Sequence, residues 1–209
     1  MRGPFRYQEL VIGPRADLLW ADLSEADLSD CDLSYADMYG ANLAGANLAG
    51  SDLSIADLSR ANLTGADLTR ADLTRANMYG ARLFRAVAVG ANISGADLTR
   101  TYLYETDLTG ADLSSTSSVR CHLTNARASG ADLSRSNFTE AKLAGIDLSG
   151  AFVARSKMVG ANLTGANLTG ANFSGANLSG ANLAGAVTEG ANFSGAVLDG
   201  AVTDSPLPT

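Results

Sequence analysis

The sequence predicts an all-β solenoid with a square cross-section. Three observations lead to it: a period of five residues, an apolar residue at the centre of each period, and a register that is never interrupted. In blocks of five from Ala16, the chain reads ADLLW ADLSE ADLSD and continues to AVTDS at 201–205. These 190 residues form 38 blocks without an insertion or deletion, and the third residue is Leu in 25 of them.

A period of five fits neither standard element of secondary structure. On an α-helix, residues five apart would point in directions about 140° apart. On a flat strand, an odd step places alternate leucines on opposite faces. The central residues therefore share one core only if the chain turns a corner once per block. Four blocks then close one turn, and successive turns stack at about 4.8 Å.

The other positions of the block agree with this geometry. The first residue is mostly Ala, because two inward side chains share a narrow interior and only one of them can be large. Cys31 and Cys121 fall on such first positions, where we expect small buried thiols. The fifth residue is Gly in 20 blocks, which suits a corner with unusual backbone angles. The stacked turns would form a rod of about 46 Å.

The repeat A(D/N)LXX resembles the signature of the pentapeptide repeat protein family, and the resemblance covers residues 16–205. It implies a right-handed quadrilateral β-helix of about nine and a half turns. It also implies that the first and third residues of each block point inward, while the second, fourth and fifth point outward. We expect residues 1–15 to form an N-terminal cap over the first turn. Residues 206–209 would be a C-terminal tail.

The outward second position becomes apolar near the C-terminus, where Val187, Val197 and Val202 replace Asp or Asn. Two interpretations stay open for these valines. One is local packing or sequence drift. The other is a homodimer interface that covers this edge of the solenoid.

Composition and missing motifs argue against several classes of function. The formal net charge of −7 disfavours general attraction to nucleic acid. No apolar run has the length of a transmembrane helix, and no secretion signal is visible, so we expect a cytoplasmic protein without a membrane partner. The chain has one histidine, His122, and lacks Walker A, dinucleotide, CxxC and HExxH motifs. We therefore expect no catalytic activity and no cofactor or metal.

Two outward columns, whose members are 20 residues apart, are acidic. Their carboxylates are Asp17, Asp37 and Asp57 in one column, and Asp32, Asp52, Asp72, Asp112 and Asp132 in the other. One interpretation is structural, with these side chains bonded to the local backbone. The other is DNA mimicry, because the resemblance implies a family in which some members bind DNA gyrase and protect it from quinolones. Duplex DNA as long as this rod carries about 27 negative charges, whereas the whole chain carries a net charge of −7. Mimicry of DNA by this chain would therefore be confined to the acidic faces or to the first two turns.

A different face departs from the repeat in the middle of the rod. We call it the mid-rod face, and its members are Arg82, Phe84, Arg85, Arg100, Tyr102, Tyr104, Arg120, His122 and Lys142. Arginine interleaved with exposed aromatic residues is typical of protein-interaction hot spots. Such clusters also bind single-stranded nucleic acid, or they only shield neighbouring Asp residues. The leading hypothesis is a non-enzymatic scaffold that binds an unidentified protein partner through this face or an acidic face. A gyrase-directed DNA mimic is the alternative.

Overall fold

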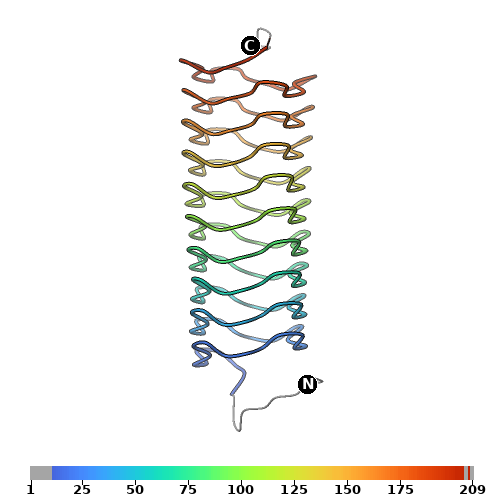
Figure 1. The fold of residues 1–209 in the computed structure, drawn as a ribbon, viewed down its shortest axis with the longest axis vertical. Coiled ribbons are helices and arrows are strands. Elements are labelled where there is room, and N and C mark those ends of the chain that lie inside the picture. The colour runs from blue at the N-terminus through green and yellow to red at the C-terminus, as the bar shows by residue number, and fades with distance from the viewer. Residues whose placement is uncertain (1–10, 205–206, 208–209) are drawn as a thin grey trace.

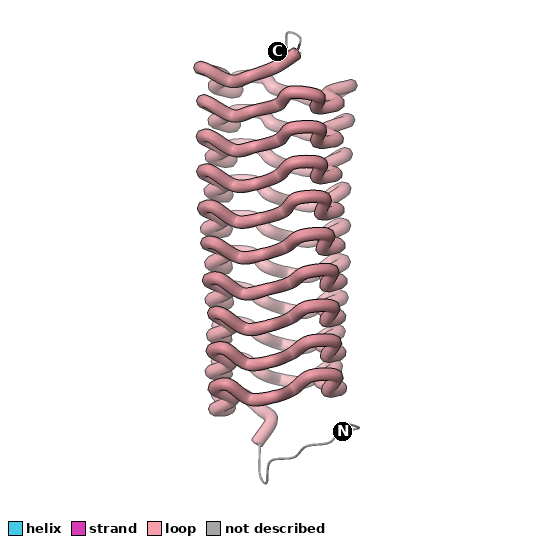
Figure 2. Tube along the Cα trace, in the orientation of Figure 1, coloured by secondary structure: helices cyan, strands magenta, loops and turns pink. Residues whose placement is uncertain are grey.

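The chain forms a rod of stacked turns (Figure 1). The computed structural model describes residues 11–204 and 207. Within these residues there is no helix and no extended strand, and the whole coil is drawn as loop (Figure 2). Its regular structure consists of isolated parallel bridges, one at the second residue of each block. They run from Asp17–Asp37 to Asn182–Val202 and always join residues 20 apart, which is the predicted period of one turn.

Backbone hydrogen bonds join each turn to the next in a fixed pattern. In the first block, the N–H of Leu18 donates to the carbonyl of Asp37 at 2.7 Å. The N–H of Asp37 donates back to the carbonyl of Ala16 at 2.9 Å, and the N–H of Trp20 donates to the carbonyl of Tyr39 at 3.0 Å. The pattern repeats along the rod, so the buried backbone groups of each face are satisfied by the neighbouring turns.

Each corner is a tight turn. At all described corners except those before Thr116 and Ser136, it closes with a hydrogen bond from the first residue of one block to the central carbonyl of the block before, as from Ala21 to Leu18 at 3.0 Å. The fifth residue has a φ between 54° and 70° at every described corner. This bond, together with a positive φ at the third residue of the turn, defines a type II turn. Glycine occupies 20 of these corners and other residues occupy 18, each at a cost of about 1 kcal/mol.

The first and central residues of the blocks form one continuous core, as predicted, although Cys31, which was expected to be buried, is only half-buried in the first turns. Phe138, Phe173 and Phe193 are its largest fully buried side chains, and the rings of Phe173 and Phe193 stack at 5.1 Å. At the C-terminal end, Ala186 and Leu198 are only half-buried, because no turn of the described chain stacks on them. The core is therefore closed along the sides of the rod and partly open at this end.

Buried hydroxyls replace Ala at several first positions in the middle of the rod. The hydroxyl of Thr101 donates to the carbonyl of Met78 at 2.8 Å, and that of Thr106 donates to the carbonyl of Leu83 at 2.7 Å. Cys121 is fully buried, and this burial raises the pKa of its thiol strongly. The polar substitutions at Thr101 and Thr106 are therefore satisfied from the turn below, and Cys121 is an unreactive core residue.

The predicted N-terminal cap lies largely outside the described residues, since its residues 1–10 are not among them. Of the remainder, Ile12 packs against the core and Val11 is exposed. Of the predicted C-terminal tail, Leu207 is described, and it packs against the core.

Candidate functional site

Stacking of successive turns builds an aromatic cluster on the mid-rod face. Tyr102 and His122 pair across neighbouring turns, and their rings stack with centroids 4.9 Å apart at an angle of 24°. The ring of Tyr104 lies 6.2 Å from that of Tyr102 and 5.4 Å from that of His122. Its hydroxyl also makes a hydrogen bond with Nδ1 of His122. Three rings from two turns thus form one rigid surface unit.

The protonation states of this cluster follow from its surroundings. Burial, and then the charge of Lys142, lowers the pKa of His122. Burial, and then Tyr102, raises the pKa of Tyr104. At neutral pH the Tyr104 hydroxyl is therefore the donor and Nδ1 of a neutral imidazole is the acceptor. The proton of His122 then sits on Nε2, which is left as a hydrogen-bond donor.

We expect His122 to titrate below its ordinary pKa of about 6.5. Because the unfolded chain would bind this proton more tightly, stability should fall as pH drops below about 6.5 and should be unaffected by this group at higher pH. The chain has a single histidine, so proton NMR of the imidazole signal reports the pKa without ambiguity. The substitution Lys142→Met should raise the pKa of His122, because it removes the neighbouring positive charge. A pKa at or above the ordinary value in the native protein would contradict the assigned environment.

Cations surround the aromatic cluster. A shallow hollow is lined by Arg100, Tyr102, Arg120, His122, Glu140 and Lys142. Arg120 is paired with Glu140 at 2.7 Å, and Arg100 donates to the hydroxyl of Tyr79 at 3.2 Å. Within residues 11–204, neither Arg82, Arg100 nor Lys142 forms an ion pair. The hollow is therefore positively charged and lined by aromatic rings.

The structure separates two members of the mid-rod face from the hollow. The guanidinium of Arg85 lies over the ring of Phe84 at 4.6 Å, and it pairs with Glu105 at 2.8 Å. Both therefore belong to the neighbouring corner, near the ion pair between Arg127 and Asp107. Sequence reasoning missed the acidic partners Glu105 and Glu140. Counting 20 residues onward from Arg85 and Arg120 would have found both.

Reversing two charges of the mid-rod face should leave the fold intact. Arg82 and Lys142 are exposed, so the double variant Arg82→Glu, Lys142→Glu should change the free energy of unfolding by less than about 1 kcal/mol. Thermal unfolding followed by circular dichroism measures this. A large loss of stability would show that these side chains are not on an exposed surface.

The acidic columns are bonded to the local backbone, as one of the two interpretations predicted. In all eight predicted carboxylates, Oδ1 accepts the backbone N–H two residues later, at 3.0 Å from Asp32 to Ser34. The Ser34 hydroxyl and N–H together lower the pKa of Asp32. Asparagines in such columns donate to the turn before, as from Asn77 to Asp57 at 3.1 Å. The columns thus support the turns, and their remaining oxygens keep the surface negative.

The valines of the predicted dimer edge, Val187, Val197 and Val202, are exposed at the C-terminal end of the rod. Among residues 11–204 and 207, no group of His, Cys, Asp and Glu side chains has the arrangement of a metal site. No helix of the described chain is long and apolar enough to cross a membrane.

Comparison with known families decides the assignment. The model of pentapeptide repeats matches in eight copies, over residues 21–59, 51–87, 81–117, 119–152, 154–183 and 176–202. The chain belongs to the pentapeptide repeat family. Proteins of this family are generally non-enzymatic.

Solved structures of other pentapeptide repeat proteins resemble the chain. Full-length QnrB1, a plasmid-mediated fluoroquinolone resistance protein, is 20% identical, with 83% of this chain and 89% of QnrB1 covered and a TM-score of 0.71. HetL, which is involved in heterocyst differentiation regulation in the cyanobacterium Nostoc sp. strain PCC 7120, is 30% identical, with 85% and 88% covered and a TM-score of 0.32. Rfr23 from the cyanobacterium Cyanothece 51142 is 33% identical, with 64% of each chain covered and a TM-score of 0.23. Comparison with curated proteins gives no match. The likeness to QnrB1 supports the quadrilateral β-helix fold.

Proposed function

We propose that this pentapeptide repeat protein is a non-enzymatic scaffold that binds a protein partner through its mid-rod face. One observation carries the proposal: Arg82, Arg100 and Lys142 have no ion-pair partner among the described residues, and they surround the stacked rings of Tyr102 and His122. Tyrosine and arginine are the residues that most often dominate protein–protein binding energies.

The backbone beneath the mid-rod face favours binding. Each turn that carries this face is bonded to the turns on both sides, so little conformational freedom is lost when a partner docks. The unpaired cations require an anionic partner, so the fitting segment carries Asp, Glu or phosphate groups. Nucleic acid fits less well, because the chain as a whole carries a net charge of −7.

Affinity capture from lysate with charge-reversed variants tests this proposal. The test variant is Arg100→Glu with Lys142→Glu. The matched control is Arg70→Glu with Arg155→Glu, which makes the same charge change on the corners that border the opposite face. From nuclease-treated lysate, we expect the native chain and the control variant to capture the same proteins. The test variant should fail to capture them. If no protein shows this difference by quantitative mass spectrometry, the mid-rod face is not a binding surface.

A second candidate function is an acidic DNA mimic that binds DNA gyrase. It is favoured by the nine acidic and no basic residues of 16–57, a segment in which the structure shows no ion pair. Its test is DNA supercoiling by purified gyrase, with the protein titrated in the presence and absence of a quinolone. Stoichiometric inhibition or drug protection, abolished by Asp32→Asn, Asp52→Asn and Asp72→Asn, would support the mimic. The absence of both effects would eliminate it.

A further inference from the structure

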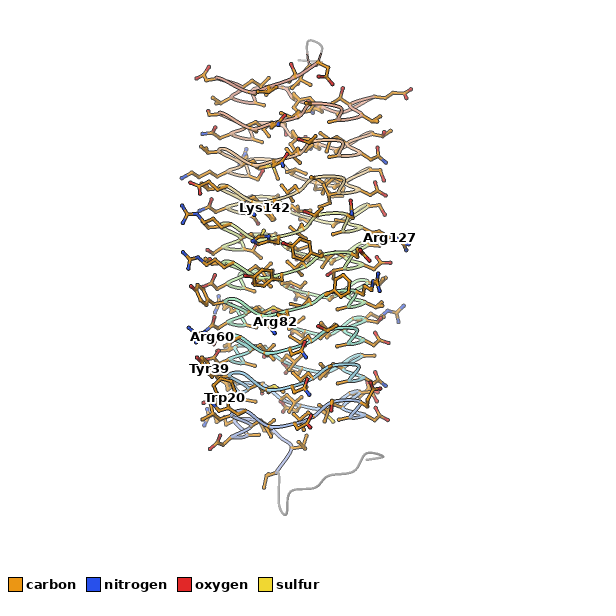
Figure 3. The ribbon with its side chains drawn as sticks, viewed as in Figure 1. Trp20, Tyr39, Arg60, Arg82, Arg127 and Lys142 are labelled. Atoms are coloured by element: carbon orange, nitrogen blue, oxygen red, sulfur yellow. The ribbon has the colours of Figure 1, made fainter. Side chains whose placement is uncertain are left out.

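A second surface, at the N-terminal end of the rod, is unlike the mid-rod face. Four of the exposed large apolar side chains gather there on two adjacent corners, and an acidic column runs between the corners. We call it the N-terminal aromatic face, and its members are Asp17, Leu19, Trp20, Tyr35, Asp37, Tyr39, Ile55 and Asp57. Figure 3 shows Trp20, Tyr39 and Arg60 one above another along one edge of the rod. Sequence reasoning identified the acidic column of this face but not the apolar and aromatic side chains beside it.

The indole of Trp20 is held in place although the residue is 63% exposed. Its ring lies over Gly40, one turn further along the chain, where a Cβ atom would collide with the indole. The ring also meets that of Tyr39 edge to face, at a centroid distance of 5.2 Å and an angle of 83°. The glycine corner and the tyrosine thus position a large exposed ring that does not contribute to the core.

The tyrosines of this face already bind cations of the chain itself. The guanidinium of Arg15 lies over the ring of Tyr35 at 5.5 Å, and that of Arg60 lies over the ring of Tyr39 at 5.7 Å. Trp20 is the strongest acceptor of this kind, yet no cation of the described residues lies over its ring. The face therefore has the chemistry for one more cation.

The acidic column between the corners adds charge to this chemistry. Asp17 and Asp37 are exposed, and each uses Oδ1 for a local backbone bond, to Leu19 at 3.3 Å and to Tyr39 at 3.1 Å. Within residues 11–204, neither carboxylate forms an ion pair. Carboxylates that form no ion pair within the described residues, beside exposed apolar side chains, favour a ligand that is both cationic and apolar.

We propose that the N-terminal aromatic face binds an extended, basic segment of a partner protein. An Arg or Lys side chain of that segment lies on the indole of Trp20 near Asp17 and Asp37, and a neighbouring apolar side chain packs against Leu19. The charge of this segment is opposite to that required by the mid-rod face. The inference does not depend on the proposed function of the mid-rod face, and each is tested separately.

Intrinsic fluorescence tests the proposal directly, because Trp20 is the single tryptophan of the chain. The probe is a capped peptide of sequence GRLGRLG, titrated into the full chain at low salt. We expect a saturable change in tryptophan emission that weakens as salt is added. The peptide GELGELG should cause no such change, and GRSGRSG, which lacks the apolar side chains, should bind more weakly.

Variants of the chain distinguish binding at this site from nonspecific binding of the peptide. Asp17→Asn with Asp37→Asn keeps the size of both side chains and should weaken GRLGRLG binding about fivefold or more, measured by the same emission. Phe152→Ala removes an exposed aromatic ring from a different face and should change nothing. Equal binding of the two charged peptides, or no saturable change with GRLGRLG, would overturn the proposal. So would a homodimer in sedimentation equilibrium that Trp20→Ala dissociates, because the occupant would then be a second copy of the chain.

Discussion

Replacing Leu68 with lysine is expected to unfold the turns around it. Leu68 is fully buried, and its side chain lies in the continuous core between neighbouring turns. A buried ammonium without a partner costs several kcal/mol, a large part of the roughly 5–15 kcal/mol that stabilise a typical domain. Urea unfolding followed by circular dichroism should show the loss. Hydrogen exchange should show it strongest in the turns that contain residue 68, because each turn contacts only its neighbours.

The control for this substitution is Leu68→Met, which conserves volume and polarity and should cost less than about 1.5 kcal/mol. The site is informative because it lies between the two surfaces described above. Fluorescence of Trp20 reports the turns before it, and the NMR signal of His122 reports the turns after it. A Leu68→Lys protein with an unchanged unfolding midpoint would refute the inward assignment of the central residue.

The period of five was sufficient to predict a square solenoid with the central residues in its core. The hand of the coil and the outward direction of the second, fourth and fifth residues were implied only by the resemblance to the family. The same period places residues 20 apart side by side in neighbouring turns, as it does Tyr102 and His122, whose rings stack. These neighbours follow from the path of the backbone, and the repeat in the sequence determines that path. The structural interpretation of the acidic columns, one of the two that the sequence left open, agrees with the structure, in which Oδ1 of Asp at the second position accepts the N–H two residues later.

Side-chain conformation was not predictable in this way. Arg85 belongs to the corner that borders the mid-rod face, yet it turns toward Glu105 and Phe84 instead of the hollow. The importance of Trp20 was not predicted, because its corner position in the repeat indicates only that the side chain lies on the surface. Its significance depends on the glycine one turn away, which leaves room for the indole, and on the ring of Tyr39. Such contacts depend on which residues occupy two neighbouring positions on the surface, and the repeat pattern does not determine those residues.

The second large effect is expected for Phe173→Ala. Phe173 is fully buried and stacks on Phe193 in the next turn, so truncation leaves a cavity that two neighbouring turns line. Such substitutions cost about 3–5 kcal/mol, whereas Phe173→Leu, which leaves a smaller void, should cost less. Unfolding in urea measures both variants. Hydrogen exchange should show the added opening in the C-terminal turns.

How far unfolding spreads from residue 173 shows whether the rod unfolds locally or as a single cooperative unit. If stability is the sum of each turn and its contacts with the next, the turns near Phe173 open by themselves. The His122 signal and the Trp20 emission then stay native, and both proposed surfaces keep their ligands. If Phe173→Ala instead abolishes both signals at one urea concentration, the rod unfolds as a single unit, and the two surfaces are energetically coupled. A partner bound at the N-terminal aromatic face would in that case also stabilise the mid-rod face, although no contact links the two partners.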